Sequence, residues 1–320
     1  MKKYFEEIGR NRALYYSWKN REDLKDRKTG PKNAWWAVTK ETVENVISIF
    51  NNFREIASDY VVGIKAGISP TTAGKILKEN GLKPMPEEKE AARILKTYEW
   101  LKKNVCWSVD SIKLLSEEGW ILIQLLVEEY SRCILGYAAG HLNTADKAVH
   151  LVNETIDKLR IKPLVVKFDR GCEFITEQME VFLSEKEIAS MPSPKHYPLF
   201  NGKEERINLT FKKFFPKKRI ISVKEICEKA DKAICVMNHD LPRKIFNGNT
   251  SAVMYEKAEN YRKEDEIELF RLIGEAKKEM ELIKNPRWDK FDVIRKSVVK
   301  SVVDARLCFI TPEDEMATNF

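Results

Sequence analysis

The chain has 320 residues, with 56 Lys and Arg against 49 Asp and Glu and 43% hydrophobic residues. This length predicts about two domains, and the apolar content excludes a disordered, purely charged chain. No run approaches the roughly 18 apolar residues of a transmembrane helix, and the start lacks the apolar core of a signal peptide. We therefore expect a cytoplasmic chain that does not enter membranes, whose net charge of +7 permits a polyanionic partner.

Residues 1–38 form a basic, aromatic segment rich in loop-forming residues. Its tryptophans, Trp18, Trp35 and Trp36, are expected to serve packing or protein contacts rather than base stacking, because aromatic side chains are first of all large apolar surfaces. Neither Cys nor His occurs in the first hundred residues, which excludes a typical zinc site there. The six cysteines of the chain are scattered, without CxxC spacing, and are expected to be reduced.

Residues 39–83 are predicted to form a small helical domain. Helical spacing of apolar residues starts after Thr39, a second helix fits residues 58–65, and Ser69-Pro70 opens a third helix that stops at Asn80-Gly81. This is the pattern of a helix-turn-helix DNA-binding domain, and an ordinary helical hairpin is an equally weighted alternative. The predicted DNA contacts in this domain are Ser69, Thr71, Thr72, Lys75 and Lys78.

Residues 84–104 are expected to be a linker, and residues 105–260 then change character. Three strand-like runs come first, followed by alternating helices and strands, which predicts a mixed sheet covered by helices. The predicted strands are 106–112, 120–127, 133–139, 164–168 and 189–191, and the predicted helices are 144–159, 176–186, 202–215 and 223–237.

Residues 261–320 are predicted to be a charged helical extension, with helices at 263–280 and 291–304. The sequence leaves three alternatives for the role of this extension: packing on the core, binding DNA or bridging subunits.

Three carboxylates have unusual settings. Asp110 is expected to end the first apolar strand, Asp169 ends the strand 164–168, and Glu205 begins a predicted helix. Acids at the ends of core strands are costly to place unless they are paired or bind a cation, although any one of them alone is better explained as a loop cap or ion pair. Three converging acids offer oxygen ligands only, which suits Mg²⁺ or Mn²⁺.

The spacing of these acids is informative, because 35 residues (170–204) lie between Asp169 and Glu205. Together with Asp110 this resembles the D,D-35-E signature of retroviral-type integrases and insertion-sequence transposases, whose core is RNase H-like. Short sequence motifs of the family match too: FDRGCEF at 168–174, SP at 193–194, NGKEER at 201–206 and EEYSRCILG at 128–136. The words NHDLPR at 238–243 and GNTSAVMY at 248–255 stand where the family has its Asn-Arg-Pro-like tail.

The N-terminal half resembles the OrfB-type transposases of the IS-three class of bacterial insertion sequences. The matching words are YYSW at 15–18, the Trp pair at 35–36 and residues 69–82. The resemblance covers about residues 8–260. It implies an RNase H-like catalytic core at 105–260, a mixed five-stranded sheet with flanking helices, between the small helical domain and the extension.

Two departures from the family pattern bear on the site. Arg170 replaces the usual Asn after the second Asp, and Glu128-Glu129 replaces an Asp pair. The permanent charge of Arg170 is expected either to contact a DNA phosphate or to weaken metal binding beside Asp169. Neither departure removes a member of the acidic triad.

The resemblance implies a DNA transposase in which Asp110, Asp169 and Glu205 are catalytic and hold two Mg²⁺ (or Mn²⁺) ions. Water would first expose a 3′-OH at the element end, and that 3′-OH would attack target DNA. The implied partners are double-stranded DNA (element ends and target), further copies of this chain, and a small upstream helix-turn-helix and leucine-zipper protein. The implied location is the bacterial cytoplasm, on the nucleoid when DNA is bound. Tyrosine or serine recombinase chemistry finds no supporting motif.

The helix after Glu205 is basic without an acid, which favours a phosphate-binding surface over a merely solvated face. The predicted DNA contacts around the core are Arg170, Lys203, Arg206, Lys212, Lys213, Lys217, Lys218 and Arg219. His196, in the loop before Glu205, is as well explained as a plain loop residue as by contact with DNA. Two alternatives stay open: a catalytically idle or domesticated DNA-binding relative, and an RNase H-like nuclease without strand transfer.

Overall fold

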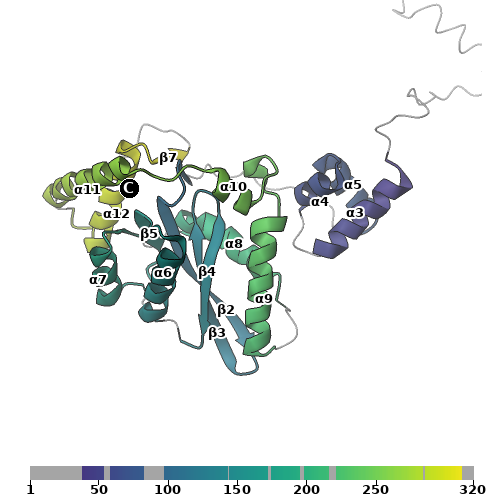
Figure 1. The fold of residues 1–320 in the computed structure, drawn as a ribbon, viewed down its shortest axis with the longest axis horizontal. Coiled ribbons are helices and arrows are strands. Elements are labelled where there is room, and N and C mark those ends of the chain that lie inside the picture. The colour runs from purple at the N-terminus through teal and green to yellow at the C-terminus, as the bar shows by residue number, and fades with distance from the viewer. Residues whose placement is uncertain are drawn as a thin grey trace, which may run out of the picture. The chain divides into compact units, whose positions relative to one another are not determined.

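The structure is a computed structural model that describes residues 38–53, 58–82, 97–142, 144–171, 174–194, 198–215, 221–283 and 285–311 (Figure 1). The tryptophans of residues 1–37, His196, Cys172 and the basic residues 217–219 lie outside the described residues. In the described part, no helix is both long and apolar enough to cross a membrane.

Three helices lie in the first two described ranges: α3 (Lys40–Phe53), α4 (Asp59–Ala66) and α5 (Pro70–Glu79). The predicted start of α5 is confirmed, because the Ser69 hydroxyl accepts the backbone N–H of Thr72 at 3.1 Å and Pro70 occupies the first turn. Helices α4 and α5 form a hairpin and approach each other closely. A Cβ at Gly63 would lie 2.9 Å from the backbone of Pro70, so only glycine fits there.

The core is a five-stranded sheet in the order β4-β3-β2-β5-β6. Its strands are β2 (Cys106–Ser116), β3 (Gly119–Glu128), β4 (Cys133–Gly140), β5 (Val165–Phe168) and β6 (Ala189–Pro192). The first three form an antiparallel meander, and β5 and β6 run parallel to β2. The expected mixed sheet of RNase H-like topology is therefore confirmed.

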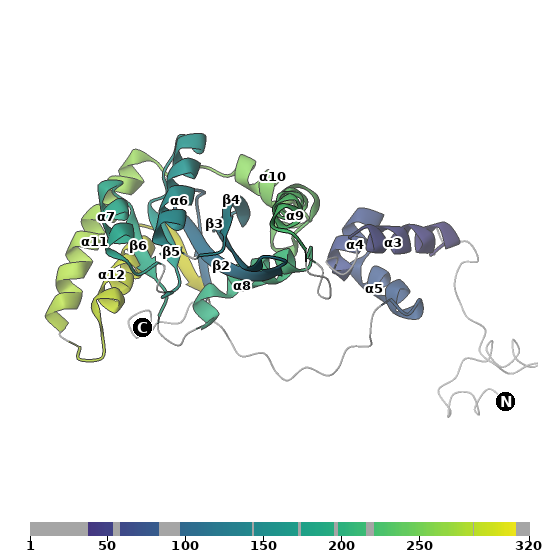
Figure 2. The ribbon, with the colours of Figure 1, turned by 90° about the horizontal axis from the view of Figure 1, so that it is seen from below.

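Helices cover both faces of this sheet (Figures 1 and 2). One face packs Trp107, Val109 and Val166 against α6 (Ala145–Leu159) and α7 (Glu177–Glu185). Because side chains alternate along a strand, the intervening residues Ser108, Asp110 and Lys167 point to the opposite face. The helix α8 (Gly202–Lys212), preceded by the 3₁₀ turn Pro198–Asn201, lies on that opposite side.

The chain after α8 covers an edge of the sheet. Helix α9 (Val223–Cys235) continues into a π-helical turn, Val236–Asp240. In that turn the Asn238 side chain accepts the N–H of Ile134 at 3.0 Å and donates to its carbonyl at 2.8 Å. The Asn238 amide thus occupies backbone groups of the edge strand β4 that an exposed edge would otherwise offer to another chain. A 3₁₀ turn, Lys244–Phe246, and α10 (Ser251–Lys257) follow.

The C-terminal extension packs on the core, one of the three roles left open above. It contains α11 (Lys263–Ile283), α12 (Lys290–Asp304) and β7 (Cys308–Thr311). From α11 and α12, Leu269, Val298 and Val302 share a buried cluster with Val165 of the sheet. The α12 helix lies beside β6, at the edge opposite β4 (Figure 2).

The prediction of a linker through residue 104 is wrong at its end. Residues Thr97–Trp100 form β1, which pairs antiparallel with β7, Trp100 opposite Cys308. Tyr98 and Trp100 are buried in the same cluster as the extension. The partner strand lies about 200 residues away in the sequence, so no local pattern could announce the pairing.

Candidate active site

Asp110 and Asp169 are brought together by the pairing of β2 with β5. Val109 lies opposite Phe168 in this parallel pair, so the residues that follow them, Asp110 and Asp169, come next to each other. The expectation that Asp110 ends its strand is wrong, because β2 continues six residues further, to Ser116, in a hairpin with β3. Asp169 does follow the last residue of β5, as predicted.

The helix α8 brings the third acid to the same place. Asn208 donates a 2.5 Å hydrogen bond from Nδ2 to Oδ2 of Asp110, which fixes this turn of α8 over the strand. Glu205 precedes Asn208 by three residues and therefore lies on the same side of the helix, one turn earlier. Glu205 is exposed, whereas Asn208 is buried.

The raised pKa of Asp110 indicates that the three acids lie near one another. Burial raises the pKa of Asp110, and the negative charges of Asp169 and Glu205 raise it further. Hydrogen bonds from the Ser111 N–H and from Asn208 act in the opposite direction and favour the carboxylate. Asp169 in turn accepts the N–H of Gly171 at 2.9 Å, which orients its carboxyl group.

The donor set fits a hard divalent cation in its chemistry. It consists of carboxylate oxygens only, on two neighbouring strands and a helix, and a cation would relieve the repulsion that raises the pKa of Asp110. Across the described ranges, however, no three His, Cys, Asp or Glu side chains already surround a single point. Glu205 faces solvent, so a three-carboxylate set requires its side chain to turn toward Asp110.

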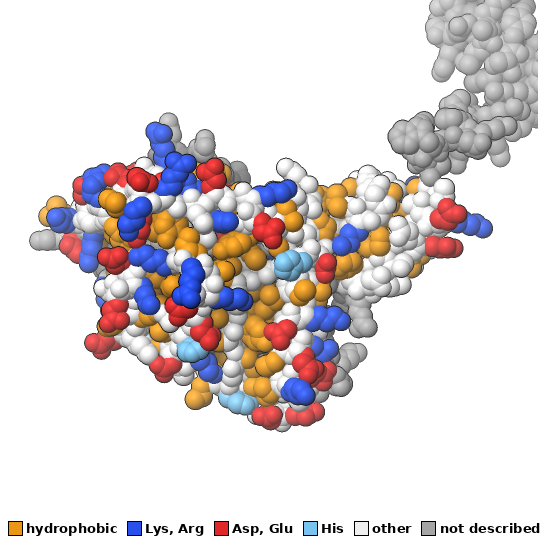
Figure 3. Space-filling model, in the orientation of Figure 1, with side chains coloured by type: hydrophobic (Ala, Val, Ile, Leu, Met, Phe, Trp, Pro, Cys, Tyr) orange, Lys and Arg blue, Asp and Glu red, His pale blue; other side chains and the backbone are white. Residues whose placement is uncertain are grey.

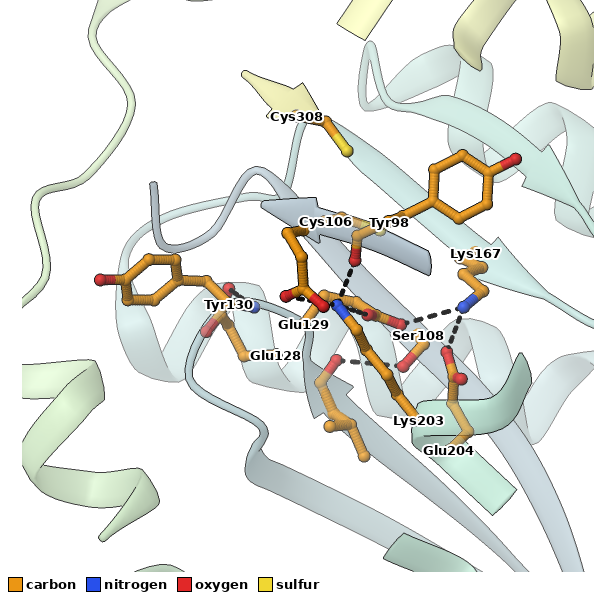
Figure 4. A network of polar contacts seen from close by, with 12 residues as sticks. Tyr98, Cys106, Ser108, Glu128, Glu129, Tyr130, Lys167, Lys203, Glu204 and Cys308 are labelled. Atoms are coloured by element: carbon orange, nitrogen blue, oxygen red, sulfur yellow. Dashed lines mark hydrogen bonds and ion pairs between the residues drawn. The ribbon is translucent and has the colours of Figure 1, made fainter. Parts of the chain in front are cut away.

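A buried ionic network (Figure 4) includes residues close in the chain to two of the acids. Lys167 of β5 places its Nζ 2.6 Å from Oε1 of Glu204 and 3.3 Å from Oε1 of Glu129, and all three side chains are at most 4% exposed. Burial and the charge of Glu129 raise the pKa of Glu204 to about 8, while Lys167 and Lys203 hold the pKa of Glu129 well below its usual range against the opposing effect of burial. Lys167 precedes Asp169 by two residues, and Glu204 adjoins Glu205, so the network joins the two elements that carry these acids.

The acidic pair Glu128-Glu129 has structural partners of its own. Glu128 accepts hydrogen bonds from the N–H groups of Asn104, Tyr130 and Ser131 and from the Ser131 hydroxyl. Burial raises the pKa of Glu128 to about 7 in spite of these donors. The pair therefore fixes the β3–β4 turn and the ionic network rather than extending the acidic site.

Two predicted DNA contacts are occupied by protein groups instead. Lys203 donates to the carbonyl of Tyr98 and lies 3.2 Å from Oε2 of Glu99. Arg170 donates from Nε to the Ser193 carbonyl and pairs with two carboxylates of the extension. A count of basic residues along the sequence cannot separate an internal counter-ion from a surface charge, which is why both were assigned to DNA.

The remaining predicted contacts in the described part are mostly solvent-accessible. On α8, Arg206, Lys212 and Lys213 are exposed. On α5, Thr71, Lys75 and Lys78 follow i, i+4, i+7 spacing along the exposed face, and Ser69 is exposed as well, while Thr72 is half-buried and hydrogen-bonded to the Ser69 hydroxyl. Over the face in Figure 3, Lys and Arg side chains are interspersed with Asp and Glu.

Sequence reasoning missed three residues of the site: Asn208, Lys167 and Glu204. Lys167 carried a usable signal, because a lysine inside the apolar run VVKF must find a counter-charge once the strand is central. Asn208 lies one helical turn after Glu205, and a systematic search for polar residues at that spacing would have found it.

Comparison with known proteins gives a family match for part of the core. Residues 101–198 match the model of the family described as Integrase core domain. This confirms the predicted resemblance to the integrase and transposase superfamily for the core. No curated protein sequence matches the chain.

Several solved structures are similar to this chain. The HTLV-2 integrase catalytic core domain in complex with magnesium shares 17% identity, covering 49% of this chain and 99% of that one, with a TM-score of 0.40. A simian T-cell lymphotropic virus intasome in complex with the PP2A regulatory subunit B56 gamma shares 13% identity over 69% of this chain and 78% of that one, with a TM-score of 0.44. The catalytic core domain of BIV integrase shares 16% identity over 48% and 95%, with a TM-score of 0.37.

Proposed function

We propose that this chain is a DNA transposase of the DDE type, akin to the OrfB-type transposases of the IS-three class. The observation that carries the proposal is the register that sets Asp110 beside Asp169, with α8 bound back to Asp110 through Asn208 and presenting Glu205 one turn away. The match of residues 101–198 to the integrase core family supports the same reaction class. Cytoplasmic location, with the chain on the nucleoid when DNA is bound, belongs to this proposal.

The three acids would hold Mg²⁺ or Mn²⁺, in two sites, and the bound ions would activate the attacking oxygen and offset charge on the leaving oxygen. Asn208 holds Oδ2 of Asp110, and the Gly171 N–H holds Oδ1 of Asp169, so both carboxylates are oriented before substrate arrives. The buried ionic network keeps β5 and the first turn of α8 at a fixed separation. Such preorganisation is what a transfer reaction between positioned groups requires.

The reaction consists of two phosphodiester exchanges. In the first, the oxygen of water bonds to phosphorus at the element end and the bond from phosphorus to the 3′ oxygen breaks, which leaves a 3′-OH. In the second, that 3′ oxygen bonds to a target phosphorus, and the target strand releases its own 3′-OH. Neither exchange requires a covalent link between protein and DNA.

DNA would be held by two basic surfaces. The exposed face of α5 offers Thr71, Lys75 and Lys78 for sequence-specific binding of element ends, and α8 offers Arg206 and Lys212 beside Glu205 for phosphates near the scissile bond. Two element ends must be joined in one event, so the active form would be an oligomer of this chain, acting either alone or with a small helix-turn-helix and leucine-zipper protein.

The proposal is tested with a labelled duplex that carries the terminal inverted repeat flanking the gene, a supercoiled target plasmid and Mg²⁺. Wild type should produce labelled plasmid, and Asp169→Asn should lose it while retaining duplex binding in a gel-shift assay. Asp304→Asn is the matched control, because this exposed acid of α12 lies outside the proposed site.

The other outcomes decide between the alternatives. Binding without cleavage by wild type would leave a catalytically idle DNA-binding relative. Cleavage without joining would leave a nuclease of the same fold. Joining that survives in Asp169→Asn would overturn the assignment of the acids.

A further inference from the structure

Arg170 follows Asp169 directly in the chain, and its guanidinium binds one backbone carbonyl and two other carboxylates. Nη1 donates to Oδ2 of Asp289 and Nη2 to Oδ1 of Asp292, both at 2.6 Å, while Nε donates to the Ser193 carbonyl at 2.7 Å. All three nitrogens are thus engaged, and the side chain is only 11% exposed. The Phe291 ring lies 5.6 Å from the guanidinium carbon.

The two carboxylates belong to the start of α12, in the C-terminal extension. Each uses one oxygen to cap the helix: Oδ1 of Asp289 accepts the Asp292 N–H, and Oδ2 of Asp292 accepts the Asp289 N–H. The other oxygen of each faces Arg170. Arg295 also donates to Oδ1 of Asp292 at 2.7 Å, so two arginines face two aspartates.

An arginine next to a metal-binding aspartate competes with the metal ion for the aspartate carboxylate. A guanidinium binds a carboxylate through paired hydrogen bonds and cannot lose its charge. A largely buried guanidinium without a counter-ion would turn to the nearest acids, and Asp169 adjoins it in the chain. Asp289 and Asp292 remove this competition by supplying two carboxylates elsewhere.

We propose that Asp289 and Asp292 are positioning residues of the active site: by binding Arg170, they keep the Asp169 carboxylate available for the divalent cation. The C-terminal extension, which lies outside the residues that match the integrase core family, is then a working part of the site rather than an added domain. This inference rests on the proposed function, since it presumes that Asp169 binds a metal ion.

The test measures the binding of Mn²⁺ to the full chain without DNA, and electron paramagnetic resonance of the free ion monitors this binding. Asp289→Asn combined with Asp292→Asn retains an oxygen for each cap, because Asn caps helices as well as Asp does, but it removes both charges that hold Arg170. The expected result is Mn²⁺ affinity weakened about tenfold, the scale of effect that outer-shell partners exert on metal sites. Thermal unfolding followed by circular dichroism checks that the fold persists.

The decisive variant adds Arg170→Gln to that double substitution. Removing the freed guanidinium should restore Mn²⁺ affinity to near the wild-type value, and Arg170→Gln alone should bind Mn²⁺ nearly as wild type does. A merely structural role predicts the reverse, because each further lost contact should weaken the site more. Asp304→Asn, on the same helix, controls for loss of a surface charge.

Two results would overturn the inference alone: unchanged Mn²⁺ affinity in the double aspartate variant, or no recovery when Arg170→Gln is added. A wild-type chain that binds no Mn²⁺ and joins no DNA would overturn the proposed function along with it. The two failures are therefore distinguishable in one set of samples.

Discussion

Replacing Lys167 with Met is the sharpest test of the buried ionic network. Methionine keeps the length of the apolar stem and removes the ammonium that lies 2.6 Å from Glu204 and 3.3 Å from Glu129. Both acids stay buried without that charge. Removing one partner of a buried ion pair costs about 3–5 kcal/mol, because the charge left behind has lost its solvation and its partner.

The structure places this substitution at the lower end of that range. With a pKa of about 8, Glu204 carries a proton at neutral pH and leaves a single buried charge, on Glu129. Glu129 also retains Lys203, whose Nζ lies 3.9 Å from its Oε2. We therefore expect Lys167→Met to lower the free energy of unfolding by about 3 kcal/mol at pH 7.

The measurement is urea unfolding followed by circular dichroism. Lys300→Met is the matched control, because Lys300 pairs with Glu279 at 2.8 Å at the surface, where the two side chains are 42% and 56% exposed. An exposed pair contributes about 1 kcal/mol or less. Adding Glu204→Gln to Lys167→Met should change the loss little, because Glu204 is already neutral at this pH.

Equal losses for Lys167→Met and Lys300→Met would refute this reasoning. They would mean that water reaches the pocket and screens its charges as it does at the surface. Loss of DNA joining in Lys167→Met at full stability would also contradict it, since Lys167 would then act in the chemistry itself rather than by holding β5 against α8.

Three further predictions use the same structure. In the folded chain Glu204 has a pKa of about 8, whereas in the unfolded chain it loses its proton near pH 4.5. The unfolding free energy of wild type relative to Glu204→Gln should therefore fall as the pH rises from about 4.5 to 8, and stay constant above that. Urea titrations at several pH values measure this difference, and a rise over the same range would contradict the prediction. Asn208→Leu removes the hydrogen bond that favours the Asp110 carboxylate, so the acidic limb of the pH profile of DNA joining should move to higher pH, and an unmoved limb would exclude this role. Gly63→Ala should destabilise the α4–α5 hairpin by about 1–3 kcal/mol, whereas Gly274→Ala, whose Cβ meets nothing within 4 Å, should stabilise α11 by up to about 1 kcal/mol; thermal melts that rank the two in the opposite order would contradict the packing argument.

Much of the core could be predicted from the sequence because its signals are local. Short runs rich in apolar residues identify β2 and β3 as strands without knowledge of their partners. The cap at Ser69 and the stop at Asn80 identify α5 in the same way. The family resemblance then supplied the RNase H-like fold, which periodicity alone leaves open.

The failures concern contacts between residues far apart in the sequence. The strand β1 forms only because β7 and the extension bury Tyr98 and Trp100, and Arg170 finds its carboxylates 119 and 122 residues further along the chain. Lys203 likewise binds groups about 105 residues before it. A charged side chain in isolation reads as a surface charge, because nothing in its neighbourhood of the sequence reveals a partner.

The rotation of α8 about its axis decides which of two adjacent acids takes part in chemistry. Glu204 and Glu205 are chemically equivalent in the sequence, and spacing alone favoured Glu205. The structure buries Glu204, Ile207, Asn208 and Phe211 on one side of the helix, so Glu204 is tied to Lys167, while Glu205 lies at the margin of that side and stays exposed. A shift of the helix by one residue would exchange the two acids, bury the one needed for the cation and unseat Asn208 from Asp110. The buried network and the Asn208 hydrogen bond fix this rotation together, and this is why residues that never contact substrate are expected to govern the reaction.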